Sequence, residues 1–110
     1  METVLRDLET FAALTGNPVT IVFDGERYKD SFSSSPMMEI LFSKRGETAD
    51  TVLERFMART DPDRRLESVL VSRDRALRDM ALGFGCRTRE PAELWQEVRR
   101  ALADAGMAAS

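Results

Sequence analysis

The sequence contains no histidine and only one cysteine, Cys86, among its 110 residues. Without histidine, a Ser-His-Asp triad, a histidine general base and the common imidazole zinc sites are excluded. A single cysteine cannot form an internal disulfide, and Cys86 is expected to be a small core residue. No apolar run is long enough to span a membrane, and the acidic N-terminal segment is unlike a signal peptide. We therefore expect a cytoplasmic protein.

The composition is that of one folded domain over residues 1–110, with 43% hydrophobic and 32% charged residues. A net charge of -3 argues against a strongly basic nucleic-acid coat. The charge is uneven, because residues 1–63 carry a net charge of -5 and residues 64–100 a net charge of +3. Since most cations are arginine, the second segment is either an ordinary solvated surface or a phosphate-binding face.

Alternating apolar patterns predict an α/β fold. Apolar residues at helical spacing predict helices over residues 2–14, 47–59, 74–83 and 91–104. Short apolar runs predict strands over residues 19–23, 37–42 and 68–72, and a short edge strand at 86–88. Residues 25–36 are expected to be an exposed loop, residues 60–63 a helix breaker, and Ser72 the N-cap of the third helix. This order predicts a mostly parallel sheet covered by helices on both faces.

Four acidic residues follow predicted strands. Asp24 comes directly after residues 19–23, Glu47 and Asp50 open the helix after residues 37–42, and Asp74 opens the helix after residues 68–72. Each alone has an ordinary role, Asp24 as a turn former and the others as complements of a helix dipole. Because ligand sites in parallel sheets lie beyond the carboxyl ends of the strands, we expect all four on one rim. Clustered carboxylates favour Mg²⁺ or Mn²⁺, which can activate water near phosphorus.

The same segments resemble the YacP-like NYN domains, a branch of the PIN-like ribonucleases. The resemblance covers residues 2–104 and is carried by four stretches: Val19 to Gly25, Met38 to Ser43, Gly46-Glu47-Thr48-Ala49-Asp50, and Val69 to Asp74. Glu-Thr-Ala-Asp in this order is the most specific of them. Ser72-Arg73-Asp74 departs from the Thr-Ser-Asp of the family, and Pro91 matches the start of its final helix.

The resemblance implies a Rossmann-like PIN fold of three layers and endonucleolytic cleavage of RNA with Mg²⁺ or Mn²⁺. Carried over by position, Asp50 and Asp74 are the expected metal ligands, and Asp24 and Glu47 are supporting catalytic acids, with Asp24 also a candidate ligand. Three arginines near Asp74 are the candidates for holding the RNA backbone: Arg73, Arg75 and Arg78.

Members of the family begin with a strand ending in Asp-Gly-Tyr-Asn, and in sequence this strand would come before residue 1 of this chain. In the sheet of the family it lies between the strands that correspond to residues 19–23 and 68–72. We expect the resulting gap to close by direct pairing of those two strands, or by a partner chain in a homodimer. Three alternatives follow for function. The chain is a metal-dependent RNA endonuclease impaired by the loss of one aspartate, a non-catalytic module that binds RNA or protein, or part of a gene product that starts upstream.

Overall fold

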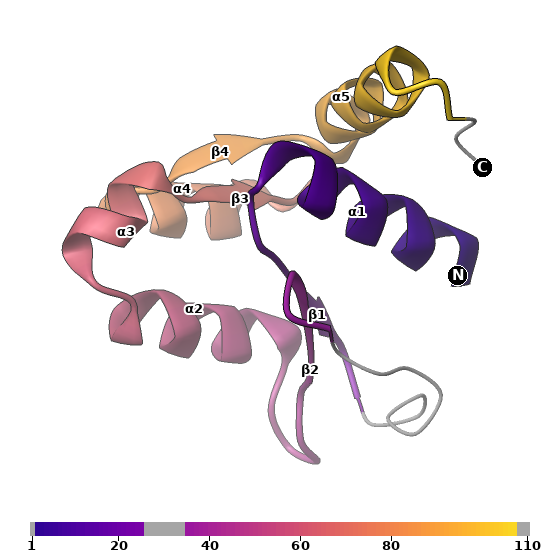
Figure 1. Ribbon diagram of the computed structural model, residues 1–110. Helices are drawn as coiled ribbons and strands as arrows, with labels where there is room; N and C mark the ends of the chain where they lie inside the picture. Colours follow the sequence, from indigo (N-terminus) through magenta and orange to yellow (C-terminus); the bar gives the residue numbers. More distant parts are fainter. Residues whose placement is uncertain (1, 26–34, 108–110) are drawn as a thin grey trace.

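The computed structural model describes residues 2–25 and 35–107, so most of the predicted loop at 25–36 lies outside the described residues. Helices and strands alternate along the chain, as predicted (Figure 1). The elements are α1 (Glu2–Thr15), β1 (Val19–Phe23), β2 (Met38–Phe42), α2 (Ala49–Arg59), α3 (Pro62–Glu67), β3 (Val69–Val71), α4 (Arg75–Gly83), β4 (Arg87–Arg89) and α5 (Pro91–Asp104). The fold is therefore of the α/β class.

The strands pair in parallel, but in two separate sheets. β1 pairs with β2 from Val19 opposite Met38 to Phe23 opposite Phe42, and β3 pairs with β4. The expected direct pairing of β1 with β3 is wrong, because these two strands belong to different sheets. Each of them keeps one edge without a strand partner among the described residues.

Two hydrophobic clusters explain why the sheets stay apart. α1 and α5 pack together over β1 and β2, and their cluster is built on Leu5, Leu8, Met38, Val98 and Leu102. α4 packs on β3 and β4 and contacts α2, and this second cluster contains Met57, Leu70, Leu77, Ala81 and Cys86. Small domains usually have one contiguous core. Here each pair of strands is packed on its own cluster, and α2 is the helix that contacts both β1 and α4.

Three helix starts differ from the sequence prediction. α2 begins at Ala49 after the cap Thr48, so Glu47 precedes the helix instead of opening it. The breaker at 60–63 ends α2 but also opens α3, because Asp61 accepts a hydrogen bond from the backbone of Asp63 and Pro62 occupies the first turn. The N-cap of α4 is Asp74 rather than Ser72. The Ser72 hydroxyl instead accepts a hydrogen bond from the Asp74 backbone N–H at 3.0 Å, which fixes the turn that leads into α4.

Candidate active site at the strand ends

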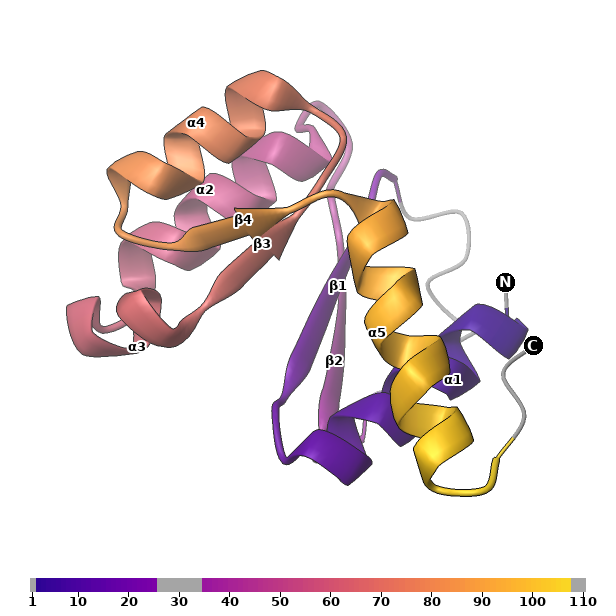
Figure 2. The ribbon, with the colours of Figure 1, turned by 90° about the horizontal axis from the view of Figure 1, so that it is seen from above.

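The parallel pairing brings the candidate acids to one side of the molecule. Figure 2 shows the N-termini of α2 and α4 on the same side as the carboxyl ends of β1 and β2, and the two helices pack against each other. Asp50 lies in the first turn of α2, and Asp74 caps α4. Asp24 directly follows β1, and all three carboxylates are exposed. Asp24, Asp50 and Asp74 therefore each stand at the start of a segment that leaves a strand end.

Asp24 is held by a residue that the sequence analysis did not single out. Ser43, which is fully buried, donates its hydroxyl to Asp24 Oδ1 at 3.0 Å and accepts the Gly25 N–H at 2.7 Å. The backbone N–H of Ser43 also donates to the carbonyl of Phe23 at 3.0 Å. These bonds tie the end of β1 to the end of β2 and fix the orientation of the Asp24 carboxylate. The available signal was a small hydroxyl residue directly after a strand.

Glu47 is committed to the loop between β2 and α2. Its Oε1 accepts the backbone N–H of Lys44 at 2.8 Å, and its Oε2 forms an ion pair with Arg55 at 2.9 Å. The backbone N–H of Lys44 and, after it, the Arg55 guanidinium hold the pKa of Glu47 below its ordinary value of 4.5. Since Thr48 caps α2 by accepting the N–H of Thr51, these two residues of the Glu-Thr-Ala-Asp segment shape the start of the helix.

Asp50 is the least engaged of the four acids. It forms no hydrogen bond or ion pair with any residue that the structure describes, whereas Asp74 Oδ1 accepts the Leu77 N–H at 3.1 Å as the cap of α4. Both lie in helix N-terminal turns, where the helix dipole stabilises negative charge. A cation approaching this edge therefore meets an uncommitted carboxylate on α2 and a capping one on α4.

The three candidate arginines differ in how they are engaged. Arg73 and Arg75 are exposed and free of ion pairs within the described ranges. Arg78 donates to the carbonyl oxygen of Ser72 at 2.9 Å and lies 3.8 Å from Glu90. Arg78 thus braces the turn before α4, and Arg73 and Arg75 are the better placed for a ligand from solvent.

Across residues 2–25 and 35–107, no three acidic or cysteine side chains are grouped closely enough to hold a metal ion together. A smaller set still suits Mg²⁺, which proteins usually bind through one or two carboxylates while substrate phosphates and waters complete the shell. The hard oxygen donors of Asp50 and Asp74 have that chemistry. Asp50 and Asp74 are therefore candidate carboxylates for such an ion.

The sequence-family model that describes the YacP-like NYN domain matches residues 2–108 of the chain. The chain belongs to this family. Its members are PIN-like ribonucleases, which agrees with the resemblance carried by the four sequence stretches. No curated protein matches the chain. No described helix has the length and apolar content required to cross a membrane.

Two solved structures resemble this NYN domain. They are crystal structures of Rae1 (YacP) from Bacillus subtilis, one of a W164L mutant, with TM-scores of 0.75 and 0.74. Both are 21% identical to the chain, covering 96% and 94% of it. The chain spans only 61% and 60% of the two Rae1 chains. At this identity the likeness shows a shared fold, and the α/β class predicted from the sequence is confirmed.

The bonds made by Ser43 predict a measurable loss of stability in this NYN domain. Ser43→Ala removes the partner of both Asp24 Oδ1 and the Gly25 N–H at a buried position. We expect the free energy of unfolding to fall by about 1–3 kcal/mol, measured by urea denaturation. Thr10→Ala, which removes an exposed hydroxyl from α1, is the matched control and should change it by less than about 0.5 kcal/mol. Equal effects of the two substitutions would contradict this role of Ser43.

The lowered pKa of Glu47 predicts how stability depends on pH. Because the pKa is lower in the folded state, its contribution is present above pH 4.5 and is lost as the pH falls through the folded value. Glu47→Gln should therefore flatten the decline of unfolding free energy below pH 4.5. Glu54→Gln, at an exposed position of α2, is the control. Parallel pH profiles for wild type and Glu47→Gln would show that the lowered pKa contributes nothing.

Proposed function

We propose that this NYN domain is an endoribonuclease that depends on Mg²⁺ or Mn²⁺. The observation that carries the proposal is the pair of exposed carboxylates Asp50 and Asp74 at the N-termini of two helices that pack together. Membership of a PIN-like ribonuclease family supports RNA as the substrate. A cytoplasmic location, where RNA is abundant, is part of the same proposal.

Each candidate residue at the N-termini of α2 and α4 has its own role in this proposal. Asp50 and Asp74 would hold the cation, and Asp24, oriented by Ser43, would be a supporting acid at the same edge rather than a third ligand. The bound ion would supply an activated water and offset negative charge on the phosphate. Arg73 and Arg75 would position the RNA backbone, helped by the N-terminus of α4. Glu47 supports the site indirectly, because its bonds to Lys44 and Arg55 fix the loop that precedes Asp50.

Cleavage of a labelled single-stranded RNA in Mn²⁺ tests this proposal. We expect Asp50→Asn and Asp74→Asn to slow cleavage at least about a hundredfold, since a bound metal contributes several kcal/mol to the transition state. Asp63→Asn, at an exposed acid of α3, is the isosteric control and should cleave like wild type. If the Asp50 and Asp74 variants both keep full activity, the site is wrong.

β1 and β3 each have one edge without a strand partner in the part of the chain that the structure describes. These edges favour a second candidate, a non-catalytic module that binds RNA or protein. Open strand edges attract further strands, and a homodimer could cover β1 by edge pairing. All five residues of β1 remain partly exposed, although their apolar sequence is typical of a buried parallel strand. Absence of cleavage together with no thermal stabilisation by Mn²⁺ would favour this candidate over the nuclease.

Size-exclusion chromatography with light scattering tests the homodimer. If a second copy covers the open edge, the mass should rise from 12.4 kDa toward twice that value as the concentration increases. Hydrogen exchange of the β1 amides should slow over the same range. A folded monomer at micromolar concentration, with exchange independent of concentration, rejects the homodimer.

A further inference from the structure

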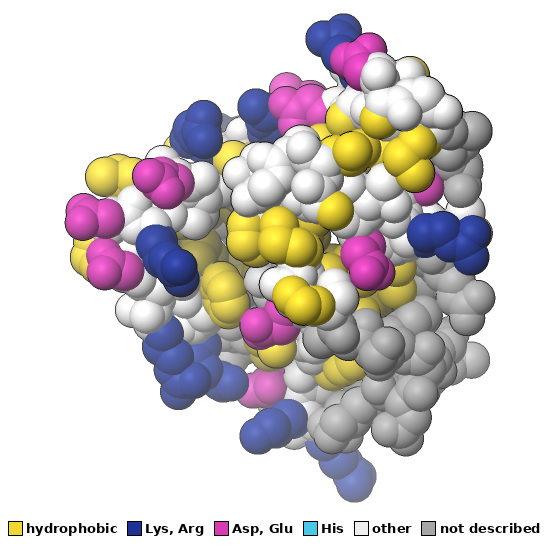
Figure 3. All heavy atoms as spheres, in the orientation of Figure 1, with side chains coloured by type: hydrophobic (Ala, Val, Ile, Leu, Met, Phe, Trp, Pro, Cys, Tyr) yellow, Lys and Arg dark blue, Asp and Glu magenta, His cyan; other side chains and the backbone are white. Residues whose placement is uncertain are grey.

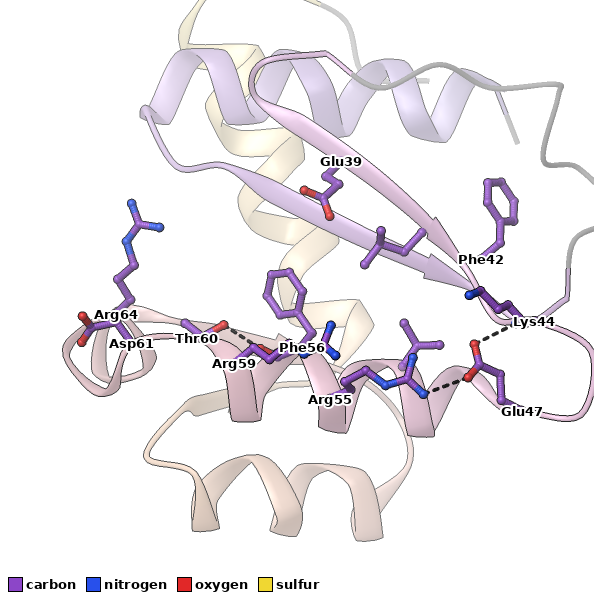
Figure 4. Close-up of a pocket in the computed structure, with 12 residues that line it drawn as sticks. Glu39, Phe42, Lys44, Glu47, Arg55, Phe56, Arg59, Thr60, Asp61 and Arg64 are labelled. Carbon is purple, nitrogen blue, oxygen red and sulfur yellow. Dashed lines mark hydrogen bonds and ion pairs between the residues drawn. The ribbon is translucent and has the colours of Figure 1, made fainter.

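A groove runs between β2 and α2, and Glu47 lies at one end of it. It has a volume of about 780 Å³, with Leu41 and Val52 among its apolar lining and α3 at one end. Figure 4 shows Phe56 rising from α2 toward β2 and Glu39 pointing from β2 into the same space. Phe56 is 38% exposed, so the groove leaves an aromatic face open to solvent. We call this space the α2–β2 groove.

Four cations from three parts of the chain line this groove: Lys44, Arg55, Arg59 and Arg64. Arg55 is neutralised by Glu47. The other three are exposed and form no ion pair within the described residues. Figure 3 shows Lys and Arg side chains along the lower left margin of the molecule, with hydrophobic and acidic side chains nearer its centre. The helical side of the groove therefore carries uncompensated positive charge.

Acids are present in the groove but are placed differently. Asp61 is used as the cap of α3, where its carboxylate accepts the Asp63 N–H at 2.9 Å. Glu39 lies across the groove on β2. Negative charge on the strand side and positive charge on the helical side would orient a ligand with its anionic backbone along α2 and α3. Its uncharged groups would then face β2.

Ordinary roles account for each residue alone. Arg59 and Arg64 lie in the last turns of α2 and α3, where cations complement the helix dipole. A single exposed phenylalanine is common on protein surfaces. Those roles do not explain why the cations of separate elements and an exposed ring line one unfilled hollow. Arginine beside an open aromatic face is the combination that binds phosphate and stacks a base.

We propose that the α2–β2 groove binds single-stranded RNA, with one base stacked on Phe56 and the flanking phosphates held by Arg59 and Arg64. A single strand is required because a base must leave its own stack to reach the ring. The proposal rests on the proposed function, since it gives that activity its substrate path. Asp50 lies in the first turn of α2 and Arg59 in the last, so the strand would run roughly 14 Å along the helix. It would then have to cross the first turn to reach Asp50, which lies on the other face of α2.

Fluorescence anisotropy with a labelled oligoadenylate of about 12 nucleotides tests the groove, in EDTA so that cleavage does not interfere. Arg59→Ala combined with Arg64→Ala should raise Kd at least about tenfold and lower the slope of log K against log salt by about 1.4. Phe56→Leu keeps an apolar side chain but removes the ring. It should raise Kd about fivefold or more without changing that slope.

Arg99→Ala combined with Arg100→Ala is the matched control, because both are exposed arginines on α5, outside the groove. This pair should change Kd less than twofold, and circular dichroism should show that every variant is folded. The groove is rejected if the control weakens binding as much as the Arg59 and Arg64 pair. It is also rejected if a duplex of the same length binds as tightly, or if Phe56→Leu binds like wild type and polyglutamate competes equally well.

The outcome separates the groove from the proposed nuclease. RNA binding that depends on Arg59, Arg64 and Phe56, without any cleavage in Mn²⁺, upholds the groove and rejects the nuclease. Cleavage that needs Asp50 and Asp74, with RNA affinity unchanged in the groove variants, upholds the nuclease and rejects the groove.

Discussion

Parallel pairing of β1 with β2 and of β3 with β4 is the constraint on which the candidate site depends. Two parallel strands must be joined by a connection that returns to the same end of the sheet, and α2 and α4 begin after the carboxyl ends of β2 and β3. Asp50 and Asp74 therefore start neighbouring helices although they are far apart in sequence. The buried hydroxyl of Ser43 extends this order to Asp24, because it bridges the ends of β1 and β2. Among the described residues, the same pairing leaves one edge of β1 and one edge of β3 without a strand partner.

Local pattern predicted most of the fold, because periodicity and caps are properties of short segments. α1 and α5 follow from apolar spacing, and Pro91 marks the start of α5. α3 escaped prediction because Asp61 and Pro62 both end one helix and begin the next. Separation of β1 from β3 could not be predicted, since it depends on which helices each strand contacts. The role of Ser43 was not predicted, because its hydrogen-bond partners Gly25 and Asp24 lie 18 and 19 residues away in the sequence.

One sequence motif both starts a helix and supplies a carboxylate for the proposed chemistry. In the Glu47 to Asp50 segment, Glu47 fixes the preceding loop and Thr48 caps α2, which leaves Asp50 as the carboxylate with no partner among the described residues. The α2–β2 groove, in contrast, could not be predicted from a sequence motif. Its cations lie mostly in residues 1–63, where the net charge of -5 conceals them, and only the fold brings them to one groove between α2, α3 and β2.

The central claim is that carboxylates from separate helices share one divalent ion. Anomalous diffraction from crystals soaked in Mn²⁺ tests it most directly, because the peak locates the ion without relying on activity. The account predicts one peak in contact with the carboxylates of Asp50 and Asp74, absent from crystals of Asp74→Asn. A peak elsewhere, or no peak with both side chains turned to different surfaces, would contradict it.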